Sequence, residues 1–165
     1  MESGEILWWL SKFLALSKLE LMINIIRKLT YTAIPSAFFD IVILLFRVLL
    51  SIQMIYAHGL KKIGIGVLEA EQVPNPLHLP EMINSVFAIA ANIFFPILVI
   101  LGLFTRLAIL PIVAVTLTGY FILHLHDAAL IKDAPFMYSL SYLLILYFGA
   151  GRFSLDYYIH LMVKK

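Results

Sequence analysis

The chain contains no cysteine, which excludes disulfide bonds, thiol redox chemistry and cysteine-ligated clusters within it. Charge is scarce too, because only 13% of the residues are charged, against about 25% in soluble domains. The net charge of +2 gives little reason to expect nucleic acid as a partner. The sequence also lacks a Walker loop, a dinucleotide fingerprint and a nucleophile motif. The first ten residues have no basic n-region, so we expect no cleaved signal peptide.

Apolar residues are abundant and make up 62% of the 165 residues. A soluble core of this size could not bury so much apolar surface, so we expect an integral membrane protein. Residues 63–80 hold three prolines and two glutamates and are expected to form an extramembrane loop. The remaining pattern predicts an all-α fold, an integral membrane four-helix bundle made by residues 34–165. Its spans are expected at about 34–58, 82–102, 105–125 and 136–150.

Residues 1–33 precede the predicted bundle and have a different pattern. Apolar residues between positions 5 and 29 are interrupted by charges, and Lys12, Glu20 and Arg27 share one side of a helical wheel. This partial amphipathicity predicts a helix that lies in the membrane interface. A poorly ordered or crossing extension remains the alternative.

The distribution of basic residues predicts the orientation in the membrane. With the N-terminus inside, 8 basic residues lie inside and 3 outside, and Arg47 within the membrane completes the 12. We therefore expect both termini in the cytoplasm. The inside residues are Lys12, Lys18, Arg27, Lys28, Arg106, Arg152, Lys164 and Lys165, and the outside residues are Lys61, Lys62 and Lys132.

The first span carries a stripe of polar residues. Asp40, Arg47, Ser51 and His58 fall within about 40° of one another on a helical wheel. An arginine at mid-bilayer costs about 2.5–3.5 kcal/mol on insertion scales, so the stripe must face other helices or trapped water. An ion pair between Asp40 and Arg47 is one explanation. The two lie about 10 Å apart along the helix axis, which favours a partner from another helix.

Polar residues on the other spans suggest what the stripe faces. We predict a polar chamber inside the bundle, open at the outer face and lined by Arg47, His58, Asn92, Tyr120 and His124. Such a chamber suits a small polar headgroup, for example that of a quinone, with the histidines relaying protons. The alternative is structural, because interhelical hydrogen bonds of about 0.6 kcal/mol each also place polar groups inside membrane bundles.

The histidine spacing argues against a tightly held metal or haem. His124 and His126 lie about 160° apart on a straight helix, so both cannot point at one centre. His58 and His124 each lack a second histidine at helical spacing on the same face. We therefore predict no metal site, regard haem as disfavoured, and keep a quinone as the candidate cofactor.

Three stretches carry a family resemblance. AHGLKKI (57–63), LVILGLFTRLAIL (98–110) and GAGRFSLD (149–156) resemble, in order and spacing, motifs of DoxX-type membrane proteins. Arg47 matches the arginine typical of their first helix, whereas Asn92 stands where relatives often have a glutamate. The matching motif positions are Gly59, Lys62, Gly102, Thr105, Arg106, Gly151, Arg152, Ser154 and Asp156.

The resemblance implies a multi-pass protein of the bacterial inner (cytoplasmic) membrane. Members of the family are linked to quinone-dependent oxidation of sulfur compounds and to membrane redox complexes. Distant relatives resemble cargo receptors or assembly chaperones. One hypothesis is therefore a quinone-interacting subunit of a membrane redox complex, at most a subunit of a quinone-linked oxidoreductase. The other is a non-enzymatic scaffold or assembly factor for another membrane protein, since a fold by itself does not determine an activity.

Overall fold

The structure is a computed structural model that describes residues 36–163 and, before them, residues 9, 12, 13, 16–18, 20–22 and 24. The chain divides into two units, Met1–Pro35 and Ser36–Lys165. Every described residue of the first unit is helical. Much of the predicted interfacial segment, including Arg27, lies outside the described residues, and its place at the membrane surface stays a prediction.

Four helices of the second unit are long and apolar enough to cross a membrane, which confirms the predicted all-α membrane bundle. The spans are Ala37–Ile63, Glu81–Leu101, Thr105–Leu123 and Ala129–Phe148. They are built from α2 (Ser36–Met54) with the turns η1 (Ile55–Gly59) and η2 (Leu60–Ile63), α3 (Glu81–Asn92), α4 (Phe94–Leu101), α5 (Thr105–Thr118) with η3 (Gly119–Leu123), and α6 (Ala129–Phe148). A last helix, α7 (Leu155–Val163), follows the bundle.

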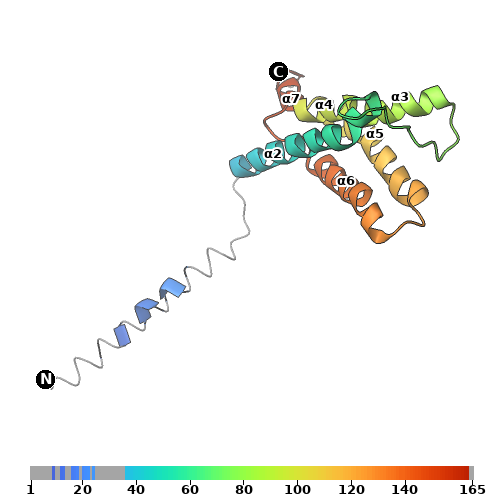
Figure 1. The fold of residues 1–165 in the computed structure, drawn as a ribbon. Coiled ribbons are helices and arrows are strands. Elements are labelled where there is room, and N and C mark those ends of the chain that lie inside the picture. Colours follow the sequence, from blue (N-terminus) through green and yellow to red (C-terminus); the bar gives the residue numbers. More distant parts are fainter. Residues whose placement is uncertain are drawn as a thin grey trace. The chain divides into compact units, whose positions relative to one another are not determined.

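The bundle is held by one apolar core. In Figure 1, α5 and α6 run side by side, as expected for spans joined by a short turn, and α2 lies next to α4. The polar stripe of the first span faces inward, since Asp40, Arg47 and Ser51 are all buried. The buried apolar residues come from α2, α4, α5 and α6 and are Met54, Val99, Ala108, Ile109, Ile112, Val113, Tyr142 and Ile145.

The first span continues five residues beyond its predicted end at His58. Gly59, the residue after the predicted end, is helical and buried, and the span ends at Ile63 before Gly64, which has a left-handed φ of 78°. Gly59 lies inside the span because the second span packs against its backbone. A Cβ there would lie 2.7 Å from both the Asn92 carbonyl oxygen and Ile93 Cγ1.

The second span is interrupted where Pro96 predicts a kink. The helix breaks at Ile93, with φ −126° and ψ −63°, and α4 begins at the next residue. Pro96 has no N–H to donate to the carbonyl of Asn92, four residues earlier, so the break falls one turn before the proline.

The fourth span begins earlier than the predicted residue 136, because α6 starts at Ala129 and includes Pro135. The Ala128 carbonyl accepts hydrogen bonds from the N–H groups of Ile131 (2.9 Å) and Lys132 (3.4 Å). The residues before Pro135 include good helix formers such as Ala129, Leu130 and Lys132, and the helix therefore continues through the proline. The chain between the third and fourth spans is correspondingly shorter than predicted.

Candidate functional site

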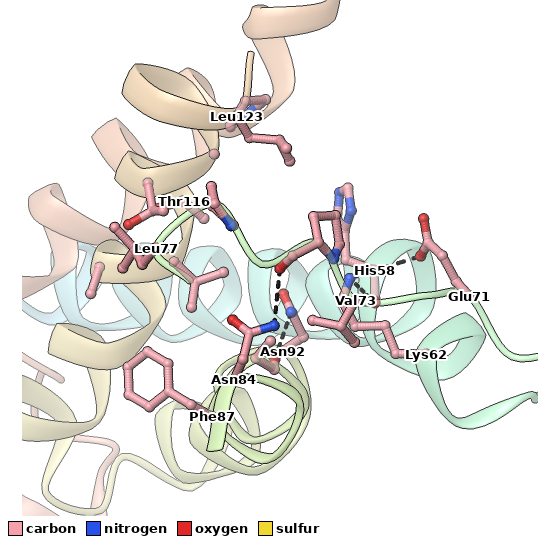
Figure 2. Close-up of a pocket in the computed structure, with 18 of the residues that line it drawn as sticks. His58, Lys62, Glu71, Val73, Leu77, Asn84, Phe87, Asn92, Thr116 and Leu123 are labelled. Carbon is pink, nitrogen blue, oxygen red and sulfur yellow. Dashed lines mark hydrogen bonds and ion pairs between the residues drawn. The ribbon is translucent and has the colours of Figure 1, made fainter. Parts of the chain in front are cut away.

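A cavity of about 640 Å³ lies at the end of the bundle where the first and third spans finish. The segment 64–80 crosses it, and Figure 2 shows this segment passing over side chains from several helices. The lining is mainly apolar. Its polar members are His58, Lys61, Lys62, Glu71, Asn84, Asn92, Thr116, Thr118, His124 and Tyr138.

His58 reaches the cavity from the π-helical turn η1. Its ring meets the ring of Tyr138 on α6 edge to face, with centroids 5.2 Å apart. Its backbone carbonyl accepts a hydrogen bond from Lys62 Nζ at 3.2 Å. Among the described residues, neither ring nitrogen of His58 nor the Tyr138 hydroxyl has a hydrogen-bond partner, so both side chains can bind a ligand atom.

His124 follows a second π-helical turn, η3, where its N–H donates to the Gly119 carbonyl at 2.9 Å. Its Nδ1 lies 2.7 Å from the Asp127 carboxylate, which orients the ring. The wider turn changes the helical phase, and Tyr120 packs on Phe136 with ring centroids 5.4 Å apart instead of lining the cavity. Turns of this kind are frequent at functional sites, and here they end both spans that supply a histidine.

Asn92 lies at the inner wall of the cavity, where α3 ends. The side chain is 4% exposed, and its Nδ2 donates to the Ala88 carbonyl at 2.7 Å. Among the described residues its Oδ1 has no hydrogen-bond partner. The amide therefore presents an acceptor beside the His58 turn, at the position where the resemblance leads us to expect a carboxylate.

Polar contacts hold the segment 64–80 over the cavity. The Glu71 carboxylate lies 3.1 Å from Lys61 Nζ and 3.8 Å from Lys62 Nζ, and the Glu71 N–H donates to the Lys61 carbonyl at 2.9 Å. Asn84 on α3 donates to the Pro74 carbonyl at 3.1 Å, as the dashed line in Figure 2 marks. This segment, which we call the roof of the cavity, is thus attached to the first two spans at separate points.

Arg47 lies elsewhere, where α4 ends. Its Nη1 donates to the carbonyls of Val99 at 2.5 Å and Ile100 at 2.7 Å, and its Nη2 donates to the Phe153 carbonyl at 2.5 Å. The side chain is 1% exposed and does not line the cavity. The guanidinium caps α4 and attaches it to the C-terminal segment, because the last carbonyls of a helix have no partners within it.

Arg47, Asp40 and three motif residues form what we call the capping junction, and the motif residues are Gly102, Ser154 and Asp156. The Asp156 carboxylate accepts from the N–H groups of Phe104 at 2.7 Å and Thr105 at 2.9 Å, which caps the start of α5. Asp40 accepts from the Arg152 N–H at 3.0 Å. Gly102, with φ 68°, is packed so tightly that a Cβ would lie 2.5 Å from the Ser154 Cβ.

The structure thus divides the predicted chamber residues into two groups. His58, Asn92 and His124 line one cavity, whereas Arg47 belongs to the capping junction and Tyr120 packs against aromatic rings. Sequence reasoning did not place Tyr138 at the site, although its spacing of four from the buried Tyr142 marks an inward face. The residues of segment 64–80 could not be placed at the site from the sequence, because an irregular segment has no helical periodicity that would show which side chains face inward.

This arrangement can bind a small polar headgroup with an apolar body. The volume lies within the range of about 300–1,000 Å³ that is usual for ligand sites. His58, Tyr138 and Asn92 offer hydrogen bonds, while the remaining walls offer apolar surface. A ligand with a ring carbonyl or hydroxyl would find both a donor and an acceptor here.

Comparison with known proteins identifies the family. A sequence model of the family described as DoxX matches residues 42–125, which is 84 of the 165 residues and includes three of the four membrane spans almost completely. No curated protein and no solved structure matches the chain. Since the match covers half of the chain and agrees with the four-span architecture, this multi-pass membrane protein belongs to the DoxX family.

Proposed function

We propose that this protein binds a quinone headgroup in the cavity and acts as the quinone-interacting subunit of a membrane redox complex. The observation that carries the proposal is the convergence of His58, Asn92 and Tyr138 on an otherwise mainly apolar cavity. The known association of DoxX-type proteins with quinone-dependent oxidation supports it.

Each polar residue has a distinct task in this proposal. His58 and the Tyr138 hydroxyl donate hydrogen bonds to a quinone carbonyl oxygen, and the Asn92 carbonyl oxygen accepts one from a quinol hydroxyl. His124, oriented by Asp127, exchanges protons with the solvent side. Arg47 takes no part, because its Nη atoms are occupied by backbone carbonyls.

The electrons come from another protein. Quinone reduction consumes two electrons and two protons, and quinol oxidation releases them. The chain has no cysteine for thiol chemistry or cluster ligation and no dinucleotide-binding motif. A partner chain with its own redox group therefore supplies or accepts the electrons, while this chain positions the quinone and moves protons.

In this proposal the membrane is the bacterial cytoplasmic membrane and both termini lie in the cytoplasm. The basic residues support this orientation, with 8 on the inner side and 3 on the outer side. It places the capping junction near the cytoplasmic surface and the cavity near the opposite surface. The segment 1–33 then lies along the cytoplasmic interface.

A binding measurement tests the proposal. Purified protein should carry quinone into an organic extract and bind decylubiquinone when titrated in detergent. His58→Ala should weaken this binding at least tenfold, or about 1.4 kcal/mol. His126→Ala is the matched control, since His126 is exposed and does not line the cavity. Absence of quinone from the extract, with equal binding by wild type and His58→Ala, would overturn the proposal.

A scaffold role is the second candidate, and one observation favours it. Ile65, Val67 and Leu68 in the segment 64–80 are 54%, 44% and 105% exposed, although they are apolar. An exposed apolar cluster of this kind is typical of a surface that contacts a partner protein. If this role holds, a client protein should co-purify in mild detergent, and Leu68→Ser should release it while His58→Ala should not.

A further inference from the structure

Some residues that line the cavity are also exposed on the side of the bundle. Phe87 on α3 is 43% exposed and Leu77 of the roof is 52% exposed, and both line the cavity. Ala114 on α5 also lines it and is exposed. In Figure 2, Phe87 points from its helix toward the side of the view where Leu77 lies, and both residues line the cavity. The cavity therefore has a mouth between α3 and α5.

The mouth lies at a depth where the surroundings are lipid. Ala114 is the central residue of the span Thr105–Leu123, about 14 Å from either end at 1.5 Å per residue. Phe87 is six residues inside the span that begins at Glu81, about 9 Å from its end. The hydrocarbon layer is about 30 Å thick, so an opening at Ala114 faces acyl chains.

Small residues keep this passage open. Ala88 on α3 and Ala114 on α5 line it from opposite helices, and a larger side chain at either position would fill part of the space. Asn92 lies one turn beyond Ala88 on the same face of α3. The route from the lipid therefore leads along an apolar wall to the polar groups at the cavity end.

We infer that this mouth is a lateral portal, through which a lipid-borne amphiphile enters and in which its hydrocarbon tail remains. The inference rests on the proposed function, because it assigns the headgroup to His58, Asn92 and Tyr138. It adds the ligand class: a headgroup that carries a long apolar chain, taken from the bilayer. An apolar opening in hydrocarbon suits such a tail and excludes strongly hydrated solutes.

The test compares two probes that share one ring. Decylubiquinone and the same quinone ring without its decyl chain are titrated into wild-type protein and into Ala114→Phe. The variant should bind decylubiquinone at least tenfold more weakly, while its affinity for the tail-less ring should change less than threefold. Leu110→Phe is the matched control, since Leu110 lies one turn away on the same helix, is 53% exposed and does not line the cavity.

A chemical version keeps the test decisive if the phenylalanine variant does not fold. Because the chain has no cysteine, Ala114→Cys and Leu110→Cys each provide a single thiol. After folding, benzyl methanethiosulfonate adds an aromatic group at either thiol, and only the group at position 114 should weaken decylubiquinone binding selectively.

The outcomes separate the portal from the proposed function. If Ala114→Phe loses affinity equally for both probes, or for neither, the portal is overturned, while the proposal that the wild-type protein binds quinone still stands. If wild-type protein binds neither probe, the proposed function fails, and the portal fails with it.

Discussion

The capping junction and the mainly apolar cavity both carry polar side chains, yet these side chains are used differently. At the capping junction, Arg47 and Asp156 are directed at backbone groups of α4, α5 and the C-terminal segment. Arg47 Nε in the junction and Thr105 Oγ1 beside it are buried without a hydrogen-bond partner among the described residues. At the cavity, His58 and Tyr138 keep free polar atoms facing open space. The first arrangement stabilises the fold, and the second is suited to binding.

This difference bears on how a charged residue within a membrane span is interpreted. An ionisable residue in a membrane span is first taken as a functional candidate. From its sequence position alone, Arg47 would be such a candidate, but its guanidinium donates to backbone carbonyls at the end of α4. The uncharged Asn92 and Tyr138 lie at the cavity instead. Charge and burial therefore do not distinguish the two roles, while the direction of the hydrogen bonds does.

Arg47→Met should have the largest effect on stability. The change removes three charge-assisted hydrogen bonds, and the Ile100 and Phe153 carbonyls lose their arginine donor, while the Val99 carbonyl keeps the Gly102 N–H. The free energy of unfolding should therefore fall by about 3–5 kcal/mol. Equilibrium unfolding in mixed micelles measures this loss. Arg106→Met, at an exposed arginine, is the control and should change stability by less than about 0.5 kcal/mol. If Arg47→Met kept its stability but lost quinone binding, Arg47 would belong to the binding site and not to the part of the molecule that stabilises the fold.

Gly59→Ala should have an intermediate effect. The added Cβ would lie 2.7 Å from the Asn92 carbonyl oxygen, so the first and second spans must separate, at a cost of about 1–3 kcal/mol. Gly119→Ala is a matched control on another span, because a Cβ there meets only Pro135 Cβ at 3.7 Å. It should be neutral or stabilise by up to about 1 kcal/mol. Equal melting temperatures for the two variants would contradict the close approach at Gly59.

Glu71→Gln should have the smallest effect on stability. Its ion pairs with Lys61 and Lys62 hold the roof, but the Glu71 side chain is 41% exposed, and such pairs contribute about 0–1 kcal/mol. The same unfolding assay should therefore show less than about 1 kcal/mol of loss. Glu69→Gln, an exposed glutamate of the same segment, is the control. A loss comparable to that of Arg47→Met would mean that the roof, too, holds the bundle together.

The placement of the helices and the placement of the site were predictable to different degrees. The inward stripe of the first span followed from a single period, and the structure buries Asp40, Arg47 and Ser51 as expected. The phase of Tyr120 did not follow, because the π-helical turn η3 shifts the helix between Thr116 and His124. A helical wheel assumes a constant angle per residue, which the wider turn containing Tyr120 does not keep.

The sequence by itself determined that this protein crosses the membrane in four helices and belongs among DoxX proteins. Apolar length and motif order are local properties, so no contact had to be known. Only the tertiary structure decided that Arg47 caps α4 while His58, Asn92 and His124 share a cavity. Those roles depend on which backbone groups meet at a helix end and on how the irregular segment 64–80 folds back. Distances between residues that are far apart in the chain settle such questions, and no periodicity encodes them.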